Sequence, residues 1–389
     1  MQATKSGVTV VGGYGALQRG NDAAFTFEQE ANFWWLTGID EPDWWVIIDG
    51  QRSKSWLVAP NIGEIQRIFD GGLDSVTAKT TSGVEGVLIA DEAMAMLRDL
   101  TKKHGVVYGL DDPSHTEHFD FALNPAPKKL WQCLDRLFAD VLDCRLILAK
   151  LRAIKQPEEI AVMKKAIQLT TTTFAAVKDA LPQLATEYEV EAEFSYRFRR
   201  AGAKGHAYDP IVAGGKNACT LHYNQNTDRL QKGNLILIDI GARVGGYAAD
   251  VTRTFAIGSA TARQKAVHAQ VEAAHHQIIK LLKPGLLVRD YHEHVDMVMK
   301  QALVNLKLMA TMNDEKNYRR YFPHAVSHGL GIDVHDSLGQ PTELLPGMVL
   351  TVEPGIYIAD EKIGVRIEDD ILITDTGHQN LSVTLPTGL

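Results

Sequence analysis

The order of apolar and polar positions divides the chain into two regions built from different elements. In the N-terminal region, short apolar runs rich in β-branched and aromatic residues alternate with stretches of helical periodicity. The runs predict strands at 7–11, 45–49, 55–59 and 106–110, and the periodic stretches predict helices at 91–104 and 128–138. This mixture of strands and helices predicts an α/β domain.

A long helix marks the start of the second region. The sequence KQPEEIAVMKKAIQL places Pro157 in the first helical turn, with Glu158 and Glu159 at the positive end of the helix dipole. Apolar residues then recur at helical spacing. We therefore expect the domain boundary within residues 146–156, with a first domain at 1–148 and a second at 149–389.

The second region contains a weak internal repeat. The segments ALPQLATEYEVEAE (180–193) and LKPGLLVRDYHEH (282–294) each follow one long helical stretch and precede another. Each helix pair is followed by strand-rich sequence, at 211–257 and 321–374. Two similar halves predict a pseudo-symmetric sheet with helices packed outside it, and an α+β fold for the chain as a whole.

Four carboxylates and one imidazole interrupt apolar or glycine-rich runs of this second region. Buried carboxylates must be paired, protonated or bound to metal. Four carboxylates carry four negative charges, which two divalent cations would cancel. The sequence therefore predicts a two-metal hydrolase whose candidate ligands are Asp239, Asp250, His328, Glu353 and Glu368.

The sequence LILIDIGARVGGYAADVTRTFAI predicts a β-hairpin that carries Asp239 and Asp250. A turn at Val244-Gly245 would place the two carboxylates directly opposite each other, whereas a turn at Gly245-Gly246 would make them diagonal neighbours. Either register puts them on one face of the sheet, within reach of one another. The alternative is one solvated aspartate and one capping aspartate.

The strand-end glutamates leave more alternatives open. Glu353 ends the apolar run GMVLTVE, and Glu368 shares a strand face with Arg366, so a plain Glu368–Arg366 ion pair would also explain that glutamate. The neighbouring Asp369 and Asp370 are expected to be solvated or paired structurally.

The segment HAVSHGLGIDVHD places His324, His328 and His335 around two glycines. It lacks the H-E-x-x-H pattern of zincins, and the residues alone leave open which histidine binds metal. His222, in CTLHYNQN, is equally compatible with a structural and a functional role. Three other histidine pairs lack matching carboxylate strands and are not expected to bind metal: His115/His118, His275/His276 and His292/His294.

Composition argues against nucleic-acid-binding, membrane-spanning and secreted proteins. The net charge is −8 and no basic run is present, which disfavours a nucleic-acid partner. No apolar stretch approaches the ~18 residues that span a membrane, and the N-terminus shows no signal-peptide core. Three sparse cysteines suggest free thiols in a reducing compartment. We expect a cytoplasmic protein without a membrane partner.

Several motifs together resemble those of a known family. The segments IDIGARVGGYAADVTRTF, HAVSHGLGIDVHD, LTVEPGIYI and GVRIEDDI resemble the metal-binding motifs of the pita-bread dinuclear metallopeptidases. RGNDAAFTFEQEANFWWLTGIDEPDWWVIID resembles the N-terminal domain shared by aminopeptidase P and eukaryotic-type prolidase. The resemblance covers essentially the whole chain. It implies a pita-bread catalytic domain after a smaller α/β domain, hydrolysis of Xaa-Pro peptide bonds, and a homodimer or homotetramer.

The resemblance also implies roles for individual residues. By motif position, Asp250 and Glu368 would bridge two metal ions, Asp239 would chelate one, and His328 and Glu353 would complete the other. The expected ion is Mn²⁺, with Co²⁺ or Zn²⁺ as alternatives. Glu353 would act as general base.

Residues around the metal ions follow from the same resemblance. His222 or His335 would stabilise the oxyanion, and Arg366 and Tyr357 would support the metal centre. The implied substrate-binding residues are His222, His324, His335, Tyr357 and, in the N-terminal domain, Asp22.

Peptide length separates two possible activities. Aminopeptidase P removes one residue from longer Xaa-Pro peptides, whereas prolidase cuts dipeptides and carries an arginine shortly after the VHD or VHE motif. The segment DSLGQPTELLPGM has no arginine here, which favours the aminopeptidase, although Arg366 or a partner subunit could supply the cation. A non-catalytic binding protein on the same fold is a more remote alternative, because all five ligands are present.

Overall fold

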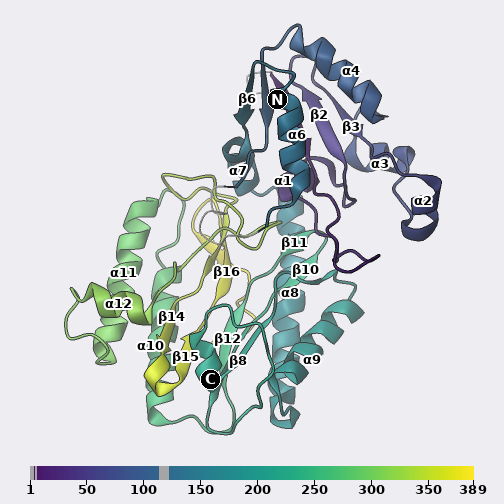
Figure 1. Cartoon of the computed structure of the whole chain (residues 1–389). Coiled ribbons are helices and arrows are strands. Elements are labelled where there is room, and N and C mark those ends of the chain that lie inside the picture. The colour runs from purple at the N-terminus through teal and green to yellow at the C-terminus, as the bar shows by residue number, and fades with distance from the viewer. Residues whose placement is uncertain (1–3, 5–6, 114–121) are drawn as a thin grey trace. The chain divides into compact units, whose positions relative to one another are not determined.

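The computed structural model describes residue 4 and residues 7–113 and 122–389. It divides into two compact units, Met1–Leu151 and Arg152–Leu389, each of which has its own sheets and core (Figure 1).

The described part of the N-terminal unit contains a mixed sheet of strand order β4-β3-β2-β1-β5-β6. The central strands β1 (Val8–Gly12), β2 (Trp45–Asp49) and β3 (Lys54–Val58) pair antiparallel. The outer strands β4 (Gly86–Leu88), β5 (Val106–Gly109) and β6 (Asp140–Asp143) pair parallel with their neighbours. The four predicted strands correspond to β1, β2, β3 and β5.

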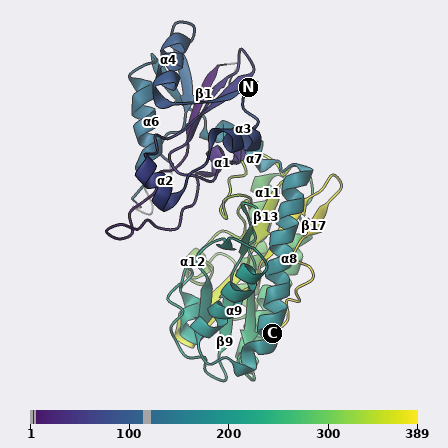
Figure 2. The same ribbon diagram turned by 90° about the vertical axis from the view of Figure 1, so that its right-hand side faces the viewer.

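Side chains of this sheet alternate between two helical layers. Val8 and Val10 face the core shared with α4 (Ala90–Thr101) and α6 (Pro125–Asp135), the two predicted helices, which lie side by side in Figure 2. Val11 and Val46 face the core shared with helices on the other side. Those helices are α1 (Ala31–Thr37), α3 (Ser75–Ser82) and α7 (Arg145–Ala153), and the unit also contains α2 (Glu64–Asp70).

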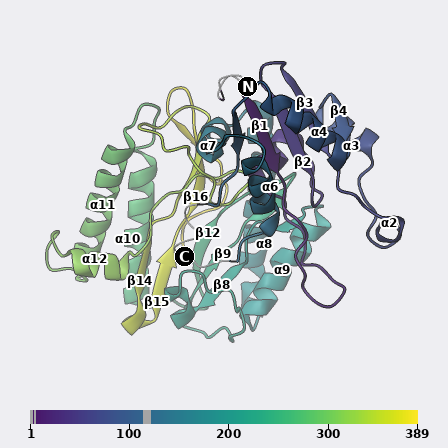
Figure 3. The ribbon, with the colours of Figure 1, turned by 45° about the horizontal axis from the view of Figure 1, so that its top comes forward.

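The C-terminal unit begins with the helix predicted at Pro157. Helix α8 (Pro157–Ala180) packs against α9 (Glu187–Arg200), and α10 (Ala262–Ile279) packs against α11 (Val288–Asn305). The two helix pairs lie on opposite sides of the strands (Figures 1 and 3). The short helix α12 (Glu315–Tyr321) follows the second pair.

Each helix pair is followed by strands, so the predicted repeat is confirmed. The first half contributes the sheet β12-β9-β8, and the second contributes β13-β16-β17 and the ribbon β14-β15. The strands of the first half are β7 (Gly205–His206), β8 (Ile211–Gly214), β9 (Leu235–Asp239), β10 (Ala242–Val244), β11 (Tyr247–Ala248) and β12 (Thr252–Ala256). Those of the second half are β13 (Val349–Val352), β14 (Gly355–Ile358), β15 (Ile363–Arg366), β16 (Asp369–Ile373) and β17 (His378–Asn380).

Each half has its own apolar core. Phe174 and Phe194 from the first helix pair pack with Ile236 of β9, and the two rings meet edge to face with centroids 4.8 Å apart. Val271 and Met299 from the second pair pack with the strands that follow them. Over residues 7–113 and 122–389, none of the helices combines the length and apolar character needed to cross a membrane.

The predicted hairpin turn is present at Gly245-Gly246. Val244 pairs with Tyr247, and the two glycines between them have φ values of +53° and +83°, as a type I′ turn requires. The same register continues into β9 and β12, where Asp239 pairs with Thr252. Asp250 is therefore the diagonal neighbour of Asp239, and the alternative turn at Val244-Gly245 is wrong.

Candidate metal centre

The five candidate ligands lie at ends and junctions of strands in the C-terminal unit. Asp239 is the last residue of β9, and Asp250 lies between β11 and β12. Glu353 lies between β13 and β14, Glu368 lies between β15 and β16, and His328 precedes β13. At such junctions a side chain can leave the regular face of a sheet, so residues from separate strands can converge.

Strand β12 brings the carboxylates of the two halves together. Thr252 pairs with Asp239 of β9 on one side and forms an isolated bridge with Glu368 on the other. The Glu368 amide donates to the Thr252 carbonyl at 3.1 Å, and the Thr252 hydroxyl donates to Glu368 Oε2 at 2.6 Å. One threonine thus fixes the distance between acids that lie far apart in the sequence.

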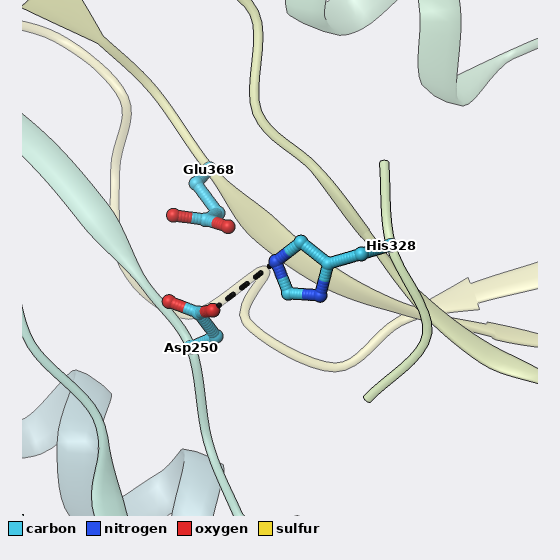
Figure 4. A group of neighbouring side chains, drawn as sticks. All are labelled: Asp250, His328 and Glu368. Atoms are coloured by element: carbon cyan, nitrogen blue, oxygen red, sulfur yellow. Dashed lines mark ion pairs between the residues drawn. The ribbon is translucent and has the colours of Figure 1, made fainter. Parts of the chain in front are cut away.

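Asp250, His328 and Glu368 point toward one another (Figure 4), with one potential ligand atom from each lying within 4.8 Å of the others. His328 Nε2 lies 3.5 Å from Asp250 Oδ2 and 3.3 Å from Glu353 Oε1. The other ring nitrogen, Nδ1, lies 3.0 Å from the Gly329 carbonyl oxygen. Because a carbonyl only accepts, Nδ1 carries the proton, and Nε2 is left facing the carboxylates.

Asp239 joins this group through two side chains. The Tyr208 hydroxyl lies 2.5 Å from Asp239 Oδ1 and 2.6 Å from Asp250 Oδ1, so it connects the two aspartates. Arg366 Nη2 donates to Asp239 Oδ2, and Arg366 Nη1 donates to the Tyr357 hydroxyl at 2.8 Å. The ion pair of Arg366 is with Asp239, so the alternative of a plain Glu368–Arg366 pair is wrong.

Burial disfavours the charged forms of these acids and so changes their pKa values. Burial, reinforced by the neighbouring carboxylates, raises the pKa of Asp250 and raises that of Glu368 well above its ordinary value. Burial also raises the pKa of Glu353, to about 7. Burial alone would lower the pKa of His328, but its carboxylate neighbours Asp250 and Glu353 raise it to about 9. The four acids face two cationic groups, Arg366 and His328, and divalent cations would neutralise the excess charge.

The remaining predicted histidines surround the same group. His324 Nε2 lies 2.9 Å from the Tyr357 hydroxyl, and its Nδ1 lies 3.5 Å from Glu353 Oε2. The His335 ring packs edge to face on His328, with centroids 4.3 Å apart. Burial, together with the nearby charge of Arg366 for His324 and of His328 for His335, lowers the pKa of both His324 and His335 to about 4. His222 itself is exposed.

Among the described residues, the other candidates are not part of the group formed by Asp250, His328 and Glu368. Asp369 and Asp370 are buried and paired, the first with Arg253 at 2.6 Å and the second with the Asp250 amide at 3.2 Å. Structural pairing is therefore confirmed, and solvation of these two aspartates is wrong. Asp22 lies exposed in the N-terminal unit, and His115 and His118 fall outside the described residues. In the part of the chain that the structure describes, the group of potential ligands includes none of His275, His276, His292 and His294.

Two residues of the centre were not predicted from the sequence. Tyr208 lies before β8 in the polar segment GHAYDP, whose pattern carries no signal for a site. Thr252 follows Asp250 by two positions, so strand alternation was an available signal that it shares a face with that aspartate. Both contact the carboxylates directly.

Comparisons with known proteins agree with this geometry. Residues 161–375 match the model of metallopeptidase family M24, and residues 1–108 match that of the aminopeptidase P N-terminal domain. The Xaa-Pro aminopeptidase of Escherichia coli K12 is 34% identical, over 95% of this chain and 89% of that protein. Xaa-Pro aminopeptidase 3 of Homo sapiens is 32% identical, over 94% of this chain and 76% of that protein.

Solved structures give the same result for the fold. Proline aminopeptidase P II from Yersinia pestis superposes with a TM-score of 0.84 at 33% identity, covering 98% of this chain and 93% of that one. Aminopeptidase P from E. coli with the inhibitor Pro-Leu gives a TM-score of 0.84 at 30% identity, covering 98% and 92%. The expected α+β fold, a pita-bread catalytic domain after a smaller N-terminal domain, is confirmed. The chain therefore belongs to metallopeptidase family M24, in its aminopeptidase P branch.

Proposed function

We propose that the protein is an Xaa-Pro aminopeptidase, a metallopeptidase that releases the N-terminal residue from peptides with proline in second position. The observation that carries this proposal is the cluster of three buried carboxylates with the partly buried Glu353 and His328, in a chain 34% identical to an Xaa-Pro aminopeptidase over 95% of its length. We assign this activity to residues 149–389, and we assign residues 1–148 to the aminopeptidase P-type N-terminal domain.

The donor set fits divalent cations. Asp239, Asp250, Glu353 and Glu368 would hold two ions together with His328 Nε2, and this oxygen-rich set with one imidazole suits Mn²⁺, Co²⁺ or Zn²⁺. We propose Mn²⁺, while a relative from E. coli is known in a Zn-substituted form in complex with product. When bound, such ions lower the pKa of water and polarise a carbonyl group.

Glu353 is the proposed general base. A general base must lie within hydrogen-bond reach of the proton that it takes, and Glu353 lies beside the ligand face of His328, with Oε1 3.3 Å from Nε2. Its Oε2 would accept the proton of the attacking water and later deliver it to the proline nitrogen, which leaves as an amine. The adjacent Thr351 hydroxyl, 3.4 Å from Glu353 Oε1, orients the carboxylate.

The imidazoles are proposed to bind the substrate and stabilise its transition state. His222 or His335 would donate to the oxygen of the scissile carbonyl as negative charge develops there. His324 would contact the substrate from beside Tyr357, whose hydroxyl accepts from Arg366. Arg366 and Tyr357 would orient Asp239 and His324, and Asp22 would bind the substrate amino group.

The choice of proline follows from the chemistry of the bond. An Xaa-Pro amide has no N–H, so an enzyme that grips this N–H loses a contact and meets a ring instead. A site that acts on the carbonyl oxygen through cations and imidazoles does not need that N–H. Such a site suits Xaa-Pro peptides.

An aminopeptidase is favoured over a dipeptidase. A dipeptidase needs a cation for the free proline carboxylate, and Arg366 is an unsuitable source. It is only 4% exposed, and its guanidinium already donates to Asp239, Tyr357 and Thr252. The cation would then have to come from elsewhere, such as a partner subunit.

Substrate length tests the proposal. The Mn²⁺-loaded protein is incubated with Ala-Pro, Ala-Pro-Ala and Ala-Pro-Ala-Ala, with Ala-Ala-Ala as the matched peptide that lacks proline. We expect cleavage of the two longer proline peptides and little cleavage of Ala-Pro or Ala-Ala-Ala. Cleavage of Ala-Pro alone would instead identify a dipeptidase.

A non-catalytic role would give a different result. If a preparation made with Mn²⁺ held no metal by elemental analysis and cleaved none of these peptides, the protein would be a binding protein on this fold. We also propose a homodimer or homotetramer, which light scattering tests. The free thiols of Cys133, Cys144 and Cys219 support a cytoplasmic location.

A further inference from the structure

We propose that Asp336, held by Arg152 and Lys155, is a positioning residue that fixes His328 for metal binding. The inference rests on the metal centre proposed above but concerns residues that do not contact its ligand atoms. Arg152 and Lys155 precede α8, more than a hundred residues before the histidine segment.

The three side chains form a buried ion cluster. Arg152 Nη2 lies 3.0 Å from Asp336 Oδ1, and Lys155 Nζ lies 3.5 Å from Asp336 Oδ2. Each of the three residues is 5% exposed or less. Arg152 also contacts Asp333 Oδ2 at 2.9 Å, but the Asp333 side chain is 54% exposed. Buried charges of this kind hold their partners in place, because separating them leaves an unpaired charge out of water.

The cluster fixes a tight loop that closes on the Gly329 carbonyl. The Asp336 amide donates to this oxygen at 2.9 Å, and His328 Nδ1 donates to the same oxygen at 3.0 Å. One carbonyl therefore links the Asp336 backbone to the ring of the candidate ligand. By accepting from Nδ1, it selects the tautomer whose Nε2 can bind a metal ion.

The glycines of this loop are explained by the same contacts. A Cβ atom on Gly331 would lie 2.0 Å from Asp336 Oδ2, and one on Gly329 would lie 2.3 Å from the Asp336 carbonyl oxygen. Neither position can carry a side chain without moving Asp336. The two glycines of the G-L-G motif therefore leave room for the backbone and the carboxylate of Asp336.

The other side of the loop is also fixed. The Leu330 amide donates to the Val349 carbonyl of β13 at 3.0 Å, and the His335 ring packs on His328. Movement of Asp336 would therefore act on His328 in two ways, through the Gly329 carbonyl and through His335. Loss of such a supporting contact typically weakens metal binding by about 10- to 100-fold.

A matched pair of substitutions tests the inference. Asp336→Asn and Asp333→Asn each change an aspartate that pairs with Arg152, but only Asp336 reaches Gly329. Full-length proteins are stripped of metal, checked for folding by circular dichroism, and titrated with MnCl₂ by isothermal titration calorimetry. We expect Kd to rise about 10- to 100-fold for Asp336→Asn and to stay within about two-fold for the exposed Asp333→Asn.

A second readout follows the hydrogen bond from His328 Nδ1 to the Gly329 carbonyl. In ¹⁵N-histidine-labelled, metal-free protein, NMR should show a slowly exchanging, hydrogen-bonded Nδ1–H of His328 in the wild type and in Asp333→Asn, and a rapidly exchanging one in Asp336→Asn. If Asp336→Asn does not fold, Lys155→Gln takes its place, because it keeps the Arg152–Asp336 pair. Its Kd for Mn²⁺ should rise between two-fold and ten-fold, an intermediate loss on the same scale.

Several outcomes would overturn the inference. They are an unchanged Kd and an unchanged Nδ1–H signal in folded Asp336→Asn, equal effects of the two aspartate substitutions, or, where Asp336→Asn does not fold, a wild-type Kd in Lys155→Gln. A wild type that binds no Mn²⁺ would overturn the proposed metal centre itself, and this inference with it. The wild-type titration therefore distinguishes the two failures.

Discussion

Three consecutive acidic side chains at the start of β16 point to two faces of the chain, and the two faces surround them with different charges. Glu368, Asp369 and Asp370 are consecutive carboxylates, and all three are buried. Because side chains alternate along a strand, Glu368 and Asp370 point toward Asp250, whereas Asp369 points toward Arg253 on the other face. Burial is therefore the same on both faces, and what differs is the charge that each carboxylate meets.

The difference separates a structural acid from a candidate metal ligand. Arg253 is fully buried, pairs with Asp369 and donates to the backbone carbonyls of Leu385 and Pro386. Although burial raises the pKa of Asp369, the charges of Arg253 and His275 bring it below its ordinary value. The pKa of Glu368 is instead raised well above its ordinary value. A buried acid with its own cation needs no metal ion, whereas a cluster with excess acid fits one.

The strongest test of this contrast is Glu368→Gln. We expect activity on Ala-Pro-Ala to fall about 10³-fold or more, because cation-assisted catalysis contributes several kcal/mol. The metal-free protein should be as stable as the wild type or more stable, since one repelling carboxylate is removed while an oxygen remains to accept from Thr252. Peptide assays and thermal unfolding in EDTA measure the two effects. Full activity, or loss of stability in EDTA, would contradict the contrast.

The opposite pattern is expected for Asp369→Asn. Removing this carboxylate leaves Arg253 buried without its ionic partner, which should lower the free energy of unfolding by about 3–5 kcal/mol. Mn²⁺ affinity of the folded protein should change little, because Asp369 faces away from the ligands. Urea unfolding and calorimetry at low temperature measure the two quantities.

The exposed Arg263–Glu361 pair provides the control for Asp369→Asn. Its atoms are 2.7 Å apart, and its side chains are 35% and 36% exposed. Glu361→Gln should cost about 0–1 kcal/mol. If Asp369→Asn cost no more than this, the buried pair would not be a structural element.

A smaller effect is expected from pH on the Asp369 side. His275 lies 3.4 Å from Asp369, but burial lowers its pKa to about 4 from an ordinary 6.5. Below pH 6.5 the unfolded chain binds a proton that the folded chain does not, so stability is complete above pH 6.5 and falls between pH 6.5 and 4. The expected loss is about 3 kcal/mol.

Comparison of the wild type with His275→Gln isolates this contribution. The free energy of unfolding is measured in EDTA between pH 4 and 7.5, and the wild type should lose about 3 kcal/mol more than the variant across that range. Parallel curves would mean that Asp369 keeps His275 charged, and that the two faces are less different than their pKa values indicate.

The sequence predicted most of the elements and the acids that converge in the candidate metal centre, for identifiable reasons. Helix α8 has a proline in its first turn and helical periodicity, and the Gly-Gly turn has a conformation that only glycine adopts freely. The acids stand out because they interrupt apolar runs. These are all local signals.

What the sequence left open depends on contacts between distant segments. The choice of turn register needed the pairing of Asp239 with Thr252. The burial and pairing of Asp369 needed Arg253, which lies more than a hundred residues away. Tyr208 lies in an irregular segment, where no periodicity marks a residue that spans two carboxylates. Assignment of His328 among three histidines came from resemblance to a family, not from spacing.

The position of Thr252 between the two halves determines when the candidate ligand set is complete during folding. Asp239 and Asp250 come from the first half and Glu353 and Glu368 from the second, and β12 joins them only when both halves are in place. A chain still being synthesised, or one half unfolded, would have no complete ligand set. The proposed peptide-cleaving activity would therefore require both halves to be folded, so incompletely folded copies would be harmless to the peptides around them.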